Sequence, residues 1–145
     1  MIPTSPKRSV TLLVVEDDEV DLMAVQRGFR QHKVANEIVA AKDGLEALQI
    51  LRGENGREPF PRPFIILLDL NMPRMNGFEF LRALRADAAL QNAIVFVLTT
   101  SKSDEDRARA YAANVAGFIV KADAGRSFLA AVEMLDHYWR VVELP

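Results

Sequence analysis

Residues 64–77 read FIILLDLNMPRMNG, and within this stretch an apolar run stops at a carboxylate. The run Phe64–Leu68 has the length and composition of a strand that is buried on both faces of a sheet. It ends at Asp69, and the turn-like residues 71–77 follow directly. A buried strand that ends in a charged side chain indicates that Asp69 serves some purpose other than packing.

Short apolar runs alternate with helical stripes along the rest of the chain. We expect strands at Val10–Val15, Asn36–Ala41, Phe64–Asp69, Ala93–Thr100 and Ala116–Lys121. We expect helices over about 19–32, 44–51, from 77 onward, 103–113 and 125–143. Strand–helix units repeated in this way predict an α/β fold, with helices on both faces of a parallel sheet in the common order 2-1-3-4-5.

Apolar side chains recur on one side of each of these predicted helices. On the second helix these are Leu45, Leu48 and Leu51. On the third helix they are Phe78, Leu81 and Leu84. The acidic residues Asp18, Glu19 and Asp21 lie at the start of the first helix, where they favour the helix dipole, and Asp18 is the expected N-cap.

Composition limits the class of protein. The chain has 145 residues, half of them apolar, which suits one globular domain over residues 10–145 after a flexible tail at 1–9. A net charge of −2 provides no basic field for nucleic acid or an anionic membrane, so we expect neither as a partner. The absence of cysteine excludes disulfides, zinc thiolate sites and cysteine nucleophiles. No segment reads as a signal peptide or a membrane span, and we expect a cytoplasmic protein.

Polar side chains lie at the carboxyl ends of four predicted strands, which is where open parallel sheets bind ligands. Glu16 and Asp17 follow the first strand, and Asp69 ends the third. Because these two strands are neighbours in the expected order, the three carboxylates should converge. Thr99 lies near the end of the fourth strand, and Lys121 ends the fifth.

A convergence of three carboxylates is unfavourable unless a cation neutralises it. Mg²⁺ takes oxygen ligands from a few carboxylates and a carbonyl while keeping several waters, so it suits this set. Lys121 adds one positive charge and Thr99 a hydroxyl group. Together these groups favour a site for a phosphoryl group, whose transfer depends mostly on positioning and charge neutralisation. Taken singly, each residue also has a structural explanation as a helix cap or a solvated strand end, and only their joint placement favours a site.

Four segments, LLVVEDD, ILLDLNMPRMNG, VLTTS and GFIVK, together resemble the response-regulator receiver domain of two-component signalling. The resemblance covers nearly the whole chain after the tail. It implies a flavodoxin-like (CheY-like) three-layer sandwich with five strands and five helices. It also implies that Asp69 accepts a phosphoryl group from the phosphohistidine of a sensor histidine kinase, and that the domain then signals through protein contacts. The domain would be no enzyme beyond its own phosphorylation and dephosphorylation.

The resemblance assigns roles to the other site residues as well. Glu16, Asp17, Asp69 and the backbone carbonyl of Asn71 would bind Mg²⁺. Thr99 and Lys121 would contact the phosphoryl group, and Phe118 would occupy the aromatic switch position on the fifth strand. One departure is Ala122, because the family usually has proline after the lysine.

A narrower resemblance is to single-domain regulators that partner phytochrome-type kinases. It rests on the double threonine followed by Ser101, the Lys121–Ala122 junction and the long loop 52–63. The last predicted helix has a second apolar row beside the row that should face the sheet, comprising Ala131, Met134, Tyr138 and Val141. It is either a long core helix with an apolar end or, together with the fifth strand, a homodimer interface.

A different class of function remains open on the residues alone. Haloacid-dehalogenase-like phosphatases also use a strand-end aspartate, Mg²⁺ and a lysine. They need a second acid two residues after the nucleophile, and this chain has Asn71 there. An amide cannot transfer the proton, which favours the signalling domain over the phosphatase.

Overall fold

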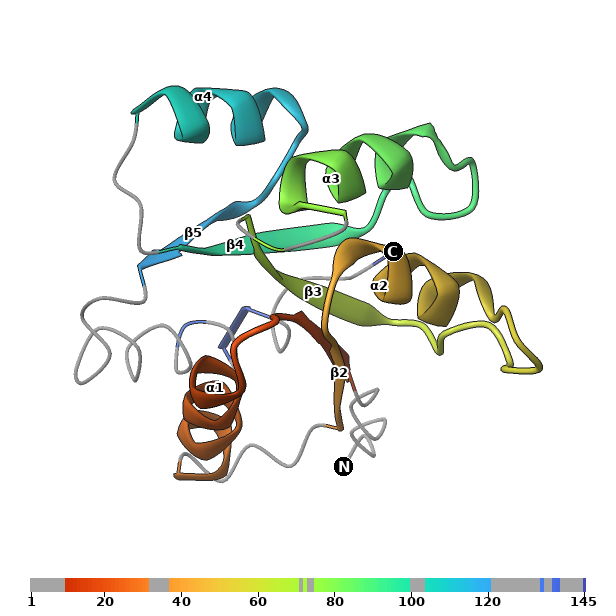
Figure 1. Cartoon of the computed structure of the whole chain (residues 1–145), viewed down its shortest axis with the longest axis horizontal. Helices are drawn as coiled ribbons and strands as arrows, with labels where there is room; N and C mark the ends of the chain where they lie inside the picture. Colours follow the sequence, from red (N-terminus) through yellow and green to blue (C-terminus); the bar gives the residue numbers. More distant parts are fainter. Residues whose placement is uncertain are drawn as a thin grey trace, which may run out of the picture.

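A computed structural model describes residues 10–31, 37–70, 72, 75–99, 104–120, 134, 137–138 and 145. Its strands are β1 (Thr11–Val15), β2 (Ile38–Ala41), β3 (Phe64–Asp69), β4 (Ile94–Thr99) and β5 (Gly117–Val120). They form one sheet in the order β2-β1-β3-β4-β5, and every neighbouring pair is parallel (Figure 1). The predicted fold class and strand order are therefore confirmed. Strands β1, β4 and β5 begin one residue later than predicted.

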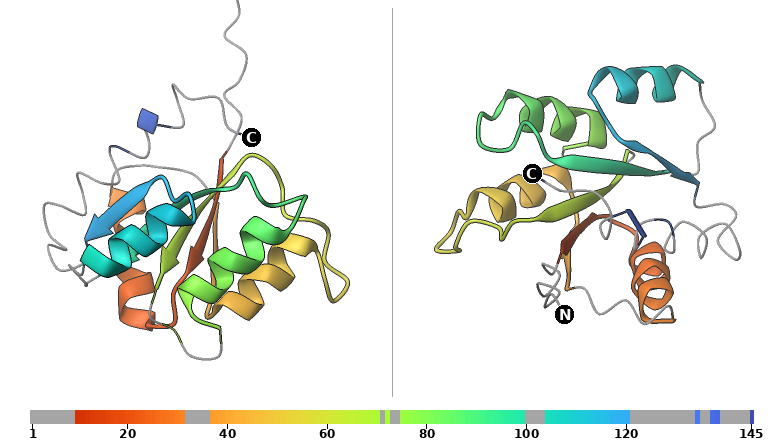
Figure 2. Two further views of the ribbon diagram at one scale, coloured as in Figure 1. Left: turned by 90° about the horizontal axis from the view of Figure 1, so that it is seen from above. Right: turned by 180° about the vertical axis from the view of Figure 1, so that it is seen from behind.

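The helices in the described part of the chain are α1 (Glu19–Gln31), α2 (Gly44–Arg52), α3 (Gly77–Ala86) and α4 (Asp104–Ala112). Helices α2, α3 and α4 cover one face of the sheet and α1 lies on the other, as Figures 1 and 2 show. Most of the predicted fifth helix, 125–143, lies outside the described residues, as does the predicted tail. Of that last helix only residues 134, 137 and 138 are described, and they are helical.

The core has two parts, one on each side of the sheet. Leu13 and Val15 of β1 belong to the cluster under α2–α4, whereas Leu12 and Val14 belong to the cluster under α1. Successive side chains of a strand point to opposite faces, so a strand covered on both sides must be apolar at every position. This is why β1 and β3 read as unbroken apolar runs. Tyr138 packs on the α1 side, with its ring 5.6 Å from that of Phe96.

The buried faces of α2 and α3 differ from the predicted stripes. Leu45 is 39% exposed, and Phe78 is only half-buried. In each helix the buried face instead begins at the first residue, Gly44 or Gly77, and includes the positions three, four and seven residues later. Four residues of the predicted stripes lie on this buried face, namely Leu48, Leu51, Leu81 and Leu84, and Phe78 packs against the core. The stripes omitted Gly44 and Gly77 because glycine does not count as apolar.

Side chains cap the starts of three helices. Asp43 accepts a hydrogen bond from the Glu46 backbone N–H at 2.8 Å and caps α2. Asn76 and Glu79 form a reciprocal capping box at the start of α3, which satisfies N–H groups that have no partner within the helix. Asp18 accepts hydrogen bonds from the N–H groups of Val20 and Asp21, at 2.8 and 3.1 Å. Its predicted role as the N-cap of α1 is confirmed.

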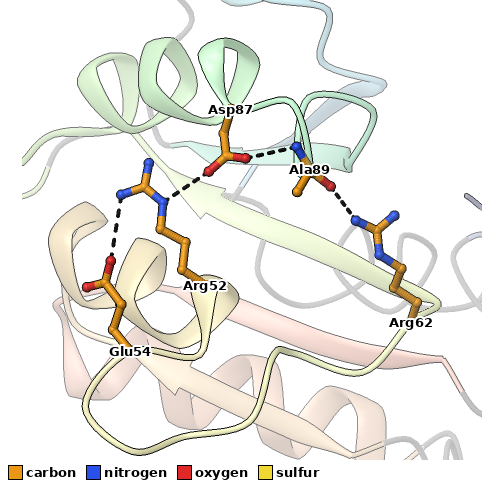
Figure 3. Close-up of polar contacts among 5 residues, drawn as sticks. All are labelled: Arg52, Glu54, Arg62, Asp87 and Ala89. Carbon is orange, nitrogen blue, oxygen red and sulfur yellow. Dashed lines mark hydrogen bonds and ion pairs between the residues drawn. The ribbon is translucent and has the colours of Figure 1, made fainter.

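Polar contacts join the two loops that lead into β3 and β4. Arg52 Nε donates to Asp87 Oδ2 at 3.1 Å, and Asp87 accepts a further hydrogen bond from the Ala89 N–H at 2.9 Å (Figure 3). Arg62 donates to the Ala89 carbonyl, and Glu54 lies 4.0 Å from Arg52. We call these five residues the amino-edge clamp, because they lie where the strands begin.

Candidate functional site

The opposite edge of the sheet brings together the ends of β1 and β3. In their register Val15 pairs with Leu68, so the next residues, Glu16 and Asp69, lie side by side. Glu16 and Asp69 are 3% and 7% exposed, whereas Asp17 is exposed. One carboxylate oxygen of each of the three residues lies within 4.8 Å of the others. The predicted convergence is confirmed, and we call these three residues the acid cluster.

Neighbouring backbone groups hold the acid cluster in place. The Glu16 N–H donates to the Ala41 carbonyl at 2.9 Å, which continues the β1–β2 pairing past the end of the strand. The Glu16 carboxylate accepts a hydrogen bond from the Asp18 N–H at 3.4 Å. Asp18 is engaged in capping α1, so the adjacent acids Asp17 and Asp18 have different surroundings and different tasks.

The turn after Asp69 is closely packed, and sequence reasoning missed the residues that make it so. The Gly77 N–H donates to the Leu70 carbonyl at 3.0 Å, and a Cβ on Gly77 would lie 2.7 Å from the Asp69 carbonyl oxygen. On the other side of the turn, the Gly44 N–H donates to the Met75 carbonyl at 3.1 Å. The described residues on either side of this turn thus contact Leu70, the Asp69 carbonyl and the start of α2.

The acid cluster fits a hard divalent cation. Oxygens bound to one Mg²⁺ at about 2.1 Å lie no more than about 4 Å apart, so the observed spacing needs only small side-chain movements. Two carboxylates that are almost buried and a third that is exposed also leave one side open for water or a phosphoryl oxygen. Without a cation this arrangement is opposed by like-charge repulsion.

The remaining predicted site residues are only partly described. Asp69 pairs with Leu98, and Thr99 is the next residue of β4, where its backbone pairs with Val120. The Thr99 side chain, Asn71, Lys121 and Ala122 lie outside the described part of the structure. Their predicted roles therefore stay predictions.

Phe118, the predicted switch residue, is described and half-buried. Its ring centroid lies 5.3 Å from that of Tyr111, and the Arg107 guanidinium lies 5.9 Å from it. Tyr111 and Arg107 both belong to α4. The side chain on β5 is thus in direct contact with the helix that lines this face of the sheet.

The profile described as "Response regulator receiver domain" matches residues 12–133, which is most of the chain. This protein is a member of the response-regulator receiver family. The family membership confirms the resemblance of the four segments and makes the chain a signalling domain. Nothing supports the alternative of a haloacid-dehalogenase-like phosphatase.

Relatives of this receiver domain include two described as regulators. Response regulator Rcp1 from Synechocystis sp. is 32% identical over 135 residues, covering 92% of each chain. The probable methanogenesis regulatory protein FilR2 from Methanothrix harundinacea is 35% identical over 129 residues, covering 88% of this chain and 82% of FilR2. Both are thus similar over most of their length, not through one segment.

Solved structures agree with the fold, and one of them is of a metal-bound regulator. The Mn²⁺-bound form of Rcp1 has a TM-score of 0.81 at 32% identity, covering 97% of this receiver domain and 99% of Rcp1. Phosphorylated RcpA, a cyanobacterial phytochrome response regulator, has a TM-score of 0.83 at 33% identity, covering 94% and 98%. In the described part of this receiver domain no helix has the length and hydropathy of a membrane span.

Proposed function

We propose that Asp69 accepts a phosphoryl group from the phosphohistidine of a sensor histidine kinase. The observation that carries this proposal is the convergence of Glu16, Asp17 and Asp69 at the carboxyl edge of a receiver-family sheet. Asp69 is the member that belongs to the central strand β3, and the packed turn after it restricts its backbone. Glu16 and Asp17 flank it from β1, where they suit metal binding.

The transfer needs little from the protein beyond position and charge. An oxygen of the Asp69 carboxylate attacks phosphorus, the phosphorus–nitrogen bond of phosphohistidine breaks, and the imidazole nitrogen leaves with the electron pair. The product is an acyl phosphate. The attacking and leaving atoms must lie in line with phosphorus, and the negative oxygens of the phosphoryl group must be neutralised. A carboxylate fixed at a strand end supplies the first requirement.

Mg²⁺ would supply most of the neutralisation. Glu16, Asp17, Asp69 and the backbone carbonyl of Asn71 would hold it, and its charge would offset that of the phosphoryl oxygens. Lys121 and the Thr99 hydroxyl would contact the phosphoryl group from β5 and β4. The cation also relieves the repulsion within the acid cluster, so metal binding and phosphorylation favour each other.

Phosphorylation then acts as a switch. It adds close to two negative charges and several hydrogen-bond acceptors at Asp69. Movement of Thr99 towards that charge would free space for Phe118, whose ring contacts Tyr111 and Arg107 of α4. A shift of Phe118 would change those contacts and bias the position of α4. Output is through protein contacts, with neither nucleic acid nor a membrane as a partner, and without enzymatic turnover of another substrate.

The partner kinase is inferred from the relatives. RcpA is described as a phytochrome response regulator, and the narrower resemblance drawn from the sequence is to the same kind of regulator. We assign a phytochrome-type kinase, such as a bacteriophytochrome, as the phosphodonor, in the cytoplasm. We also propose a homodimer formed by the last helix and β5. A chain that ends at Tyr138 should then be monomeric in light scattering, and a dimer of unchanged mass would contradict this interface.

Phosphotransfer from a radiolabelled histidine kinase tests the proposed acceptor. The wild type should be labelled in the presence of Mg²⁺ and not after chelation, and Asp69→Asn should remain unlabelled. Asp87→Asn is the matched control, because it makes the same substitution in the amino-edge clamp and should be labelled normally. Persistent labelling of Asp69→Asn would show that another residue is the acceptor.

A further inference from the structure

A groove of about 480 Å³ lies between α3 and α4, on the face of the sheet opposite α1. Figures 1 and 2 show these two helices side by side. Its lining includes three arginines, Arg82, Arg85 and Arg109, together with the apolar surfaces of Phe78, Ala86 and Ala112. We call it the α3–α4 groove. Its residues are distinct from those of the acid cluster.

Arg85 forms a fixed, positively charged end of the groove. Its Nε donates to the Ala113 carbonyl at 2.8 Å, and its Nη2 donates to the Asn114 carbonyl at 2.9 Å. Its Nη1 donates to the carbonyls of Gln91 and Ala93, both at 2.8 Å. Burial lowers the pKa of Arg85, because removal from water disfavours the charged form. The side chain ties the end of α4 to the loop before β4, so that end of the groove is rigid.

Two further arginines line the groove and are exposed to solvent. The Arg109 guanidinium lies 4.0 Å from the centre of the Phe78 ring. This cation–π contact orients the guanidinium without occupying its N–H donors. Arg82 is exposed on α3. None of the described lining residues is acidic. The groove therefore differs from the amino-edge clamp, where Arg52 faces the carboxylate of Asp87.

We propose that the α3–α4 groove binds an acidic peptide segment of a partner protein. The planar guanidinium groups of Arg82 and Arg109 match carboxylates, and Phe78 with the two alanines offers an apolar floor for the intervening side chains. Charge complementarity thus identifies the occupant. This inference goes beyond the phosphoacceptor role and does not depend on it.

The helix ends that line the groove offer no cluster of backbone N–H groups for a phosphate. Phosphate sites commonly add backbone N–H groups at a helix N-terminus. Here the first turn of α3 is already closed by the capping box of Asn76 and Glu79. The other lining positions include the last turns of α3 and α4, where a helix presents backbone carbonyls and not N–H groups. Recognition would rest on the arginine side chains alone.

Fluorescence anisotropy with a short labelled peptide of alternating aspartate and leucine residues tests the proposal. We expect saturable binding that weakens as salt is raised. The variant Arg82→Gln/Arg109→Gln should weaken binding about fivefold or more. Arg27→Gln/Arg30→Gln removes the same charge from α1 on the other face of the sheet and should leave binding within about twofold. Circular dichroism checks that both variants fold.

A second pair of variants tests the groove by adding charge. Ala112 is exposed at the end of α4, so a larger side chain there can be accommodated. Ala112→Glu should weaken peptide binding more than Ala112→Gln, which adds a similar volume without charge.

Equal losses from the two double-arginine variants would overturn the proposal, because binding would then follow net charge. Tighter, groove-dependent binding of inorganic pyrophosphate than of the peptide would also overturn it, in favour of a small phosphorylated ligand.

Discussion

Charged side chains are arranged in opposite ways at the two edges of the sheet. At the carboxyl edge, Glu16, Asp17 and Asp69 place three carboxylates within 4.8 Å of one another. At the amino edge, Asp87 accepts hydrogen bonds from Arg52 and from the Ala89 backbone. The first arrangement brings like charges together, which a bound cation would offset, whereas the second pairs opposite charges. The acid cluster is thus suited to binding a ligand, whereas the amino-edge clamp serves to stabilise the fold.

Close backbone packing is found at both edges, because a Cβ on Gly53, just after α2, would lie 2.6 Å from the Pro59 nitrogen. Gly77 is pressed against Leu70 and Asp69 at the carboxyl edge, where a Cβ would lie 2.6 Å from Leu70 Cα. A Cβ on Gly56, in the loop before β3, would meet nothing within 4 Å, and this position needs glycine only for its φ of 79°. The backbone is thus closely packed beside the proposed acceptor, where a small displacement would misplace a reacting atom.

The largest effect is expected for Gly77→Ala. The added methyl group must displace backbone atoms, so the free energy of unfolding should fall by about 3 kcal/mol. Gly56→Ala is the control and should cost about 1 kcal/mol, from its left-handed conformation alone. Urea denaturation measures both. Equal losses would mean that the turn after Asp69 is no tighter than the surface loop.

The second-largest effect is expected for metal binding at the acid cluster. At a Mg²⁺ concentration about a hundred times the dissociation constant, binding should raise the free energy of unfolding by about 2.7 kcal/mol. Asp17→Asn removes a ligand and should lose most of that gain. Asp18→Asn is the matched control, since Asp18 caps α1 and asparagine caps equally well. Thermal unfolding with and without Mg²⁺ distinguishes them, and a lost response in the control would place the metal elsewhere.

Without metal, Asp17→Asn should change the free energy of unfolding in the opposite direction. Asp17→Asn relieves like-charge repulsion in the acid cluster, so the metal-free protein should become more stable by about 1 kcal/mol. Urea denaturation in the presence of a chelator measures this. A destabilised Asp17→Asn variant would indicate that the metal-free cluster is already neutralised, and the contrast between the two edges would then be weaker.

The smallest effect is expected at Asp87. The Ala89 backbone hydrogen bond and then the Arg52 side chain lower the pKa of Asp87 in the folded protein. A folded-state pKa below the unfolded-state value contributes stability above the unfolded-state pKa, and this is lost as pH falls through the folded-state pKa. Asp87→Asn should therefore be slightly less stable than wild type at neutral pH, with the difference vanishing in acid. A difference that is constant with pH would exclude the charge as its cause.

The sheet, its strand order and the three acids that meet at its edge could all be predicted from the amino-acid sequence. Each follows from a local rule: alternating strand and helix patterns predict a parallel sheet, and parallel strands bring their carboxyl ends to one edge. The acids could therefore be identified from where β1 and β3 stop. The same local patterns were less complete for the helix faces, where Leu45 is partly exposed and the buried glycines 44 and 77 were not identified.

The distances between helices, strands and loops could be known only from the folded structure. The need for glycine at 44 and 77 depends on atoms from other elements, such as Met75 and Leu70, that no periodicity reveals. The anchoring of Arg85 by carbonyls from two loops is likewise invisible in a sequence, because its partners lie 6 to 29 residues away. Side-chain period sets which residues are buried, whereas distances between elements arise only when the whole chain packs. The α3–α4 groove likewise could not be predicted from the sequence, because its two helices come together only when the sheet assembles.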